Sequence, residues 1–213
     1  MKKKPLFIVF EGIDGSGKST QAQYLYQKMK DEGDEVYLTC EPTTGPIGSL
    51  IRNIFNGRIE ADHRTIAGLF VADRLDHLLN KTDGIIEKLN KGIHVISDRY
   101  CLSSYAYQGT HMQMDWVIQA NSQATSLLRP DLHVYIDIDP LVSMERMARS
   151  RSNSDLYETL DNLRKVRENY HRAIEKISAG EHIVSLDGSE NPQFIGQKIL
   201  DEVNKLRLGL QQY

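Results

Sequence analysis

The sequence contains little cysteine and no clustered metal ligands. Its only two cysteines, Cys40 and Cys101, are widely separated, so neither a disulfide framework nor a cysteine metal site is indicated. The seven histidines include no H-E-x-x-H pattern or similar cluster. Widely spaced cysteines are typical of proteins that keep their thiols reduced, and we therefore expect a cytoplasmic protein.

An excess of positive charge and long hydrophobic runs are also absent. The formal net charge is -3, which gives no indication of a general basic surface for nucleic acid. The apolar run after the N-terminal lysines spans only residues 6–10, which is too short for a signal peptide or a membrane helix. We therefore expect a globular protein with neither a nucleic-acid nor a membrane partner.

What the sequence does contain is an alternation of short apolar strands and helical patterns over its 213 residues. The expected strands are residues 6–10, 36–39, 93–97, 132–136 and 183–186. The expected helices are residues 22–29, 47–55, 66–79, 85–92, 115–128, 140–146, 158–177 and 191–206, while residues 103–109 form a polar, aromatic segment. This order predicts one α/β domain over residues 1–213, a doubly wound sheet of about five parallel strands with helices on both faces. Ligands of such sheets bind at the carboxyl ends of the strands.

The segment Gly12–Ser19 reads G-I-D-G-S-G-K-S and fits the phosphate-binding pattern G-x-x-x-x-G-K-[ST]. It lies between an expected strand and an expected helix, which is the context that the motif requires. Its glycines let backbone amides approach a phosphate, and the following helix directs its positive end at the same point. Lys18 is expected to reach the outer phosphates, and the Ser19 hydroxyl to ligate Mg2+. The sequence therefore predicts binding of a nucleoside triphosphate.

A phosphate loop occurs in GTPases, ATPases, kinases and motor proteins, so the loop alone does not decide among these classes. Three further features do. No N-K-x-D motif of the GTPase type is present. Asp98 ends an expected strand, where a carboxylate can hold the water shell of a metal, although many such aspartates only cap a helix. Arg146, Arg149 and Arg151 lie beside an expected loop tip at residues 152–154. They are either a solvated basic face or a mobile lid that excludes water and stabilises charge, and the phosphate loop favours the lid.

Longer motifs along nearly the whole chain resemble those of the thymidylate kinase family, P-loop enzymes that convert dTMP to dTDP. The matching stretches are F-E-G-I-D-G-S-G-K-S-T-Q at 10–21, E-P at 41–42, F-V-A-D-R at 70–74, D-R-Y-C-L-S-S-Y-A-Y-Q-G at 98–109, R-P-D-L at 129–132 and Y-E at 157–158. The resemblance implies transfer of the γ-phosphate of ATP to dTMP, with Mg2+ as cofactor and a homodimer as the assembly. The alternative is a kinase of another deoxynucleotide or of a deoxynucleoside.

The resemblance also implies which residues bind the two nucleotides. For ATP these are Gly12, Ile13, Asp14, Gly15, Ser16, Gly17, Lys18, Ser19, Thr20 and Arg146, which is expected to stack on adenine. For dTMP, within an acceptor region at about 41–109 and beyond it, they are Asp14, Arg52, Phe70, Arg74, Arg99, Ser103, Ser104, Tyr107, Gln108 and Tyr157. In the family the aromatic of F-x-x-x-R stacks on thymine and its arginine donates to a thymine oxygen. Without the resemblance, Phe70 would be interpreted as core and Arg74 as a surface charge.

The residues expected to act in phosphoryl transfer are Lys18, Asp98, Arg99, Asp14, Arg149 and Arg151, with Mg2+ held by Ser19 and, through water, by Asp98. Arg99 resembles the family's arginine on the acceptor phosphate, for which a guanidinium fork is suited. One form of the family carries a catalytic arginine in the phosphate loop, where this chain has Gly15. The resemblance therefore implies that a lid at about 146–158 supplies the positive charge.

Three details of the chain bear on these expectations. Cys40 and Leu156 stand where many relatives carry arginines, in the acceptor site and in the lid. Loss of the first arginine would remove one contact to the acceptor phosphate unless Arg52 or Arg99 compensates. An apolar face around residues 66, 69 and 78 fits a dimer contact or the core equally well.

Overall fold

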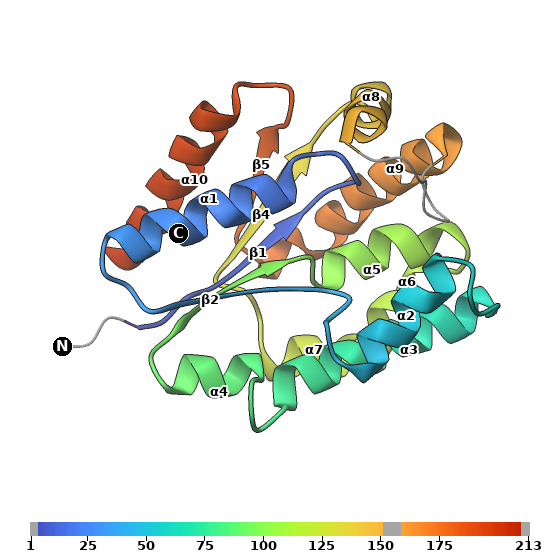
Figure 1. Ribbon diagram of the computed structural model, residues 1–213, viewed down its shortest axis with the longest axis horizontal. Helices are drawn as coiled ribbons and strands as arrows, with labels where there is room; N and C mark the ends of the chain where they lie inside the picture. The colour runs from blue at the N-terminus through green and yellow to red at the C-terminus, as the bar shows by residue number, and fades with distance from the viewer. Residues whose placement is uncertain (1–3, 151–158, 210–213) are drawn as a thin grey trace.

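The computed structural model describes residues 4–150 and 159–209, and in that part of the chain five parallel strands form one sheet (Figure 1). The strands are β1 (Phe7–Glu11), β2 (Val36–Cys40), β3 (His94–Asp98), β4 (Leu132–Asp137) and β5 (Ile183–Asp187). Their order in the sheet is β2-β3-β1-β4-β5, with every neighbouring pair parallel. The predicted α/β class and the predicted five-stranded parallel sheet are confirmed.

The central strand β1 is buried along its whole length because helices cover both faces of the sheet. Side chains alternate along a strand, so Ile8 and Phe10 point to one face. There they pack with residues of α1 (Lys18–Asp31) and α10 (Pro192–Arg207), which lie together on that side in Figure 1. Apolar residues at i, i+3 and i+4 of these helices supply the contact surface.

Phe7, Val9 and Glu11 point to the other face, where most of the remaining helices gather. These are α3 (His63–Leu79), α4 (Ile85–Asn90), α5 (Cys101–Tyr107), α6 (Met114–Ala120), α7 (Ser122–Leu127) and α9 (Leu160–Ile177). The other helical segments are α2 (Pro46–Phe55), η1 (Gln108–Thr110), α8 (Pro140–Ser150) and η2 (Ser178–Gly180). This face therefore carries α3 and α5, which hold the predicted acceptor residues Phe70, Arg74, Ser103, Ser104 and Tyr107.

Three segments differ from the sequence expectation, the first being the helix expected at 140–146, which continues to Ser150 as α8. The polar, aromatic segment 103–109 begins inside α5, in which every residue is buried, so no amphipathic spacing marks it as a helix. The single helix expected at residues 115–128 is two helices, α6 and α7, separated at Asn121. The Asn121 side chain is buried and bonded to Arg74 and to the carbonyl of Val117, which explains the break. In the described ranges, none of the helices combines the length and the apolarity that crossing a membrane requires.

Candidate active site

The phosphate loop connects β1 to α1, and its backbone is built around glycines with positive φ. Gly12 and Gly15 have φ of 147° and 74°, in or near the left-handed range that favours glycine. A Cβ on Gly12 would lie 2.6 Å from the carbonyl oxygen of Ile136, and one on Gly15 2.7 Å from that of Ser143. The loop is therefore clamped between β4 and α8, and neither position tolerates a side chain.

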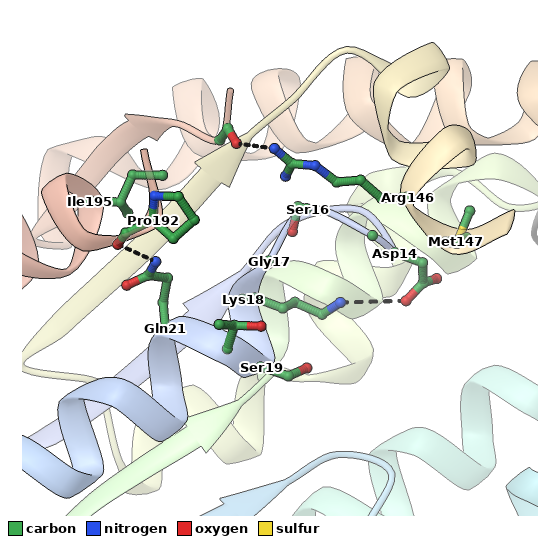
Figure 2. Close-up of a pocket in the computed structure, with 13 residues that line it drawn as sticks. Asp14, Ser16, Gly17, Lys18, Ser19, Gln21, Arg146, Met147, Pro192 and Ile195 are labelled. Atoms are coloured by element: carbon green, nitrogen blue, oxygen red, sulfur yellow. Dashed lines mark hydrogen bonds and ion pairs between the residues drawn. The ribbon is translucent and has the colours of Figure 1, made fainter. Parts of the chain in front are cut away.

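A pocket of about 430 Å³ opens beside the loop. Figure 2 shows the loop and the start of α1 on one side, with Arg146 and Met147 of α8 above and Pro192 and Ile195 of α10 opposite. Arg146 Nη2 donates to the carbonyl of Gly188 at 3.0 Å and so spans the pocket. The pocket brings together most of the residues predicted to bind ATP, from position 14 to position 20 and at 146. Ile13 instead lies in the core.

Asp14, Lys18 and Arg99 meet next to this pocket. Asp14 Oδ1 accepts from Arg99 Nη2 at 2.5 Å and from Lys18 Nζ at 3.4 Å. Burial alone would raise the pKa of Asp14, but the two cations hold it well below its ordinary value. Burial, aided by the nearby Arg99 charge, lowers the pKa of Lys18. One carboxylate thus aligns two cations at the edge of the pocket.

Tyr107 closes the other side of Asp14. Its hydroxyl donates to Asp14 Oδ2 at 2.8 Å and accepts from the Asp14 N–H at 3.1 Å and from Arg99 Nη2 at 3.2 Å. Arg99 has a φ of 80°, a left-handed conformation that non-glycine residues rarely adopt. The phosphate loop and the D-R-Y motif are therefore joined directly, through Asp14, Tyr107 and Arg99.

Ser19 and Asp98 contact one another where α1 begins and β3 ends. Ser19 Oγ donates to Asp98 Oδ2, while the buried Asp98 Oδ1 has no hydrogen-bond partner in the described structure. A hydroxyl and a carboxylate with a spare oxygen are the hard donors that Mg2+ prefers. Within residues 4–150 and 159–209, no group of three or more His, Cys, Asp or Glu side chains forms a metal site of its own. The pair fits a metal that takes its remaining ligands from water and phosphates.

Arg74 is buried, and all five of its N–H donors are directed at protein oxygens. Nε and Nη2 donate to Glu41 Oε2 at 2.9 and 2.6 Å, and Nη2 also donates to the carbonyl of Tyr100 at 3.1 Å. Nη1 donates to Ser104 Oγ at 3.1 Å and to Asn121 Oδ1. The arginine is thus fixed at the centre of the predicted acceptor region, neither at the surface nor unpaired.

Glu41, which accepts two of the Arg74 bonds, is itself buried and has a partner on each carboxylate oxygen. Its Oε1 lies 3.1 Å from His77 Nδ1, and His77 Nε2 lies 2.8 Å from Thr39 Oγ1. Burial would raise the pKa of Glu41, but the Arg74 charge and the His77 hydrogen bond hold it below its ordinary value. The ion pair therefore stays charged at neutral pH.

Of the other predicted acceptor residues, Ser104 contacts this ion pair directly, through its bond from Arg74. Phe70 is half-buried and its ring lies 5.9 Å from that of Phe55. Arg52 donates to the carbonyls of Pro42 and Thr43, and so holds the loop after β2. Ser103, Ser104 and Gln108 are buried on α5 and η1, and Gln108 Oε1 has no partner in the described structure. Among the three arginines predicted for the acceptor site, Arg52, Arg74 and Arg99, the described hydrogen bonds join only Arg99 to the phosphate loop.

Of the predicted lid at 146–158, only residues 146–150 lie in the described part of the chain. Arg149 is exposed near the end of α8, and no hydrogen bond or ion pair between described residues joins it to the phosphate loop. Arg151 and Tyr157 lie outside the described residues. Sequence reasoning also missed four residues that hold the site together: Glu11, Glu41, Asn121 and Tyr170. Glu11 and Glu41 stand inside the quoted motifs, but Asn121 and Tyr170 carry no sequence signal.

Comparisons with known proteins agree with the motifs. A sequence model of the family described as thymidylate kinase matches residues 10–199. The thymidylate kinase of Leptospira borgpetersenii serovar Hardjo-bovis is 34% identical over 200 residues, which cover 93% of each protein. The probable thymidylate kinase of Pyrococcus horikoshii is 41% identical over 175 residues, covering 79% of this chain and 82% of the relative. That of Pyrobaculum aerophilum is 36% identical over 201 residues, covering 94% and 97%.

Proposed function

The chain belongs to the thymidylate kinase family, and from this premise we propose that it transfers the γ-phosphate of ATP to dTMP, giving dTDP and ADP. The observation that carries the proposal is that Lys18 and Arg99 both bind the Asp14 carboxylate. This contact lies at the edge of the pocket beside the phosphate loop, which we call the donor pocket. Lys18 belongs to the phosphate loop, which we propose binds the donor ATP. Arg99 belongs to the D-R-Y motif, which precedes α5 and the proposed acceptor site. Two cations at that border stabilise a phosphoryl group that passes from one nucleotide to the other.

The reaction needs little proton chemistry from the protein. The phosphate of a nucleoside monophosphate is already a dianion near pH 7, so its oxygen attacks without a strong general base. The contribution of the chain is to bring the two phosphates together and to offset their negative charge. Lys18 does this on the donor side and Arg99 on the acceptor side. Arg149 and Arg151 are proposed to add charge from the lid.

We propose that Ser19 and, through water, Asp98 hold Mg2+ when ATP is bound. The metal neutralises charge on the phosphates of the donor. Support comes from the Ser19–Asp98 contact and from the unpartnered Asp98 Oδ1 beside it. Removing divalent cations with EDTA should abolish turnover, and added Mg2+ should restore it. Full activity in EDTA would contradict this assignment.

Recognition of thymine is proposed for Phe70, Arg74 and Ser104. Since every Arg74 donor already has a protein partner, contact with a thymine oxygen requires Arg74 to exchange one of them. The Ser104 hydroxyl is the partner most suited to that exchange, because it accepts one Arg74 bond and still has its own proton to donate. Tyr107, beside Asp14, is proposed to lie against the deoxyribose.

The test of the proposed reaction is ADP release measured with dTMP, dUMP, CMP, AMP and thymidine as acceptors. dTMP should support the fastest release at equal concentrations. Faster release with thymidine would indicate a deoxynucleoside kinase, and faster release with another monophosphate would indicate a different nucleotide kinase. Release that does not depend on any acceptor would contradict a kinase and favour a nucleotide-dependent regulator.

A homodimer and a cytoplasmic location are further parts of the proposal. Ile66 and Leu78, predicted either for a dimer contact or for the core, are buried within the single chain. A dimer interface would instead use apolar residues that remain exposed on the neighbouring helices α3, α6 and α7, namely Leu79, Trp116 and Leu127. Light scattering at assay concentration should give the mass of two chains, and the mass of one chain would contradict the dimer. The two unpaired cysteines support the cytoplasmic location, which cell fractionation tests.

A further inference from the structure

Glu11 is a fully buried carboxylate that the proposed reaction does not use. It is the last residue of β1, immediately before the phosphate loop, and none of its surface is exposed. Burial raises the pKa of Glu11 above its ordinary value of 4.5, despite hydrogen bonds and nearby cations that act in the opposite direction. A buried carboxyl group is costly to retain where an apolar side chain would fit, so its contacts indicate what it does.

Both Glu11 oxygens accept hydrogen bonds from the segment that begins with the D-R-Y motif and continues into α5. Oε1 accepts from the Tyr100 N–H at 2.9 Å, and Oε2 accepts from Ser103 Oγ at 2.5 Å. The first bond anchors the backbone directly after Arg99, whose φ of 80° is strained. The second bond orients a hydroxyl that receives Arg99 Nη1 at 3.0 Å. One carboxylate therefore fixes both the backbone and a side-chain partner of Arg99.

Tyr170 of α9 completes this arrangement. Its hydroxyl lies 2.8 Å from Ser103 Oγ and 3.3 Å from Glu11 Oε2, and it accepts from Arg99 Nη1 at 3.3 Å. It also donates to the carbonyl of Gly12 in the phosphate loop at 3.2 Å. Hydrogen bonds that share partners in a buried network strengthen one another. Nη1 of Arg99 is thus held by Ser103 and Tyr170, both of which contact Glu11, while Nη2 contacts Asp14.

We propose that Glu11 and Tyr170 are positioning residues for phosphoryl transfer, which act by holding Arg99 in the orientation that the two phosphates require. They do not touch either nucleotide themselves. The inference rests on the proposed role of Arg99 and adds the part of the chain that makes that role possible. It also explains a charged residue at a strand position where an apolar one would be expected.

A double-mutant cycle between Glu11→Gln and Arg99→Ala tests this. Glutamine keeps one oxygen for the Tyr100 N–H but presents an amide NH2 group, which cannot accept a hydrogen bond, to the Ser103 hydroxyl. In the otherwise unchanged protein, Glu11→Gln should lower kcat about ten-fold, as is common for groups that share one network, with KM for ATP changed less than about two-fold. In the Arg99→Ala background the same substitution should change kcat less than about two-fold. Glu175→Gln, on an exposed position of α9, is the matched control and should leave kcat unchanged.

Tyr170→Phe provides a second variant that leaves no unpaired charge, and it remains informative if Glu11→Gln folds poorly. It should also lower kcat about ten-fold alone and have little effect when Arg99 is alanine. The inference would be overturned if the fold loss of kcat in each double variant equalled the product of the losses in its two single variants. Such a result would show that Glu11 and Tyr170 affect turnover independently of Arg99. An Arg99→Ala protein with unchanged kcat would instead contradict the proposed role of Arg99. ADP release that does not depend on dTMP would contradict the proposed function itself.

Discussion

Arg99 Nη2 and Asp14 Oδ1 lie 2.5 Å apart, although their residues are 85 positions apart in the chain. Parallel pairing of β1 with β3 brings this about, because it places the ends of the two strands side by side, with Phe10 opposite Asp98. The contact joins the phosphate loop to the D-R-Y segment, which leads into α5. A charged pair at this junction accounts for the proposed chemistry better than either motif does alone.

Lys18→Ala should lower kcat by at least about 100-fold, the scale seen when one preorganised donor is removed from an active site. Asp14 keeps its bond to Arg99 in this variant, so the fold should persist with a cooperative thermal transition. Steady-state kinetics and circular dichroism make the measurement. Lys28→Ala, at an exposed position on the same helix, is the control and should retain full turnover. Near-normal kcat in Lys18→Ala would refute the role of this lysine.

Gly15→Ala should destabilise the protein more than Gly33→Ala does. Both glycines have positive φ, at 74° and 89°, so both substitutions incur a backbone strain of about 1–2 kcal/mol. Only at position 15 does the new Cβ also meet other atoms, 2.7 Å from the carbonyl oxygen of Ser143 and 3.0 Å from Met147 Cγ. Urea unfolding compares the two free energies. Equal losses would mean that α8 is not packed on the phosphate loop as described.

Ser104→Ala should raise KM for dTMP about ten-fold, as expected when one hydrogen bond to a buried group is lost, and leave KM for ATP unchanged. The hydroxyl accepts from Arg74 in the acceptor region and lies outside the donor pocket. Ser178→Ala, exposed in η2, serves as the comparison variant. An equal rise of both KM values would argue against a contact with the acceptor base.

Glu41→Gln should make the free energy of unfolding depend less on pH in the acid range. The pKa of Glu41 is lower in the folded protein than its ordinary value of 4.5, so folding favours the ionised form. Its contribution to stability is therefore present above about pH 4.5 and is lost as the pH falls through the lower folded value. At pH 7 the variant should be less stable by about 3–5 kcal/mol, because Arg74 is left buried without its counter-charge. The difference in unfolding free energy between the two proteins should shrink as the pH is lowered from about 4.5 to about 2.5, whereas parallel curves would contradict the buried pair.

The pocket beside the phosphate loop, the candidate ATP site, could be located from the sequence because it is local. One short segment supplies the strand end, the glycines, the lysine and the helix start, and the pocket in the structure is lined by residues 14–21 in a continuous run. The surroundings of Arg74 were not predictable in the same way. Its partners Glu41 and Asn121 lie 33 and 47 positions away, and only the folded chain brings them together.

The helix α5 shows a second limit of sequence patterns. Its seven residues are all buried, so the contrast between a polar and an apolar face is missing. Its serines carry partners instead, Glu11 for Ser103 and Arg74 for Ser104, which makes a polar sequence compatible with the interior. Arg74 follows the same logic: an isolated arginine predicts a surface position, but a buried glutamate opposite it reverses that preference.

The central claim is that donor and acceptor phosphates meet beside Lys18 and Arg99, with the pyrimidine ring near Phe70. A crystal structure with dTMP and a non-hydrolysable ATP analogue bound measures this directly. The account predicts that the analogue's phosphates lie in the loop pocket, that the dTMP phosphate contacts Arg99, and that thymine lies between Phe70 and Ser104. Two phosphate groups that fail to converge at Lys18, or a thymine ring away from Phe70, would contradict it.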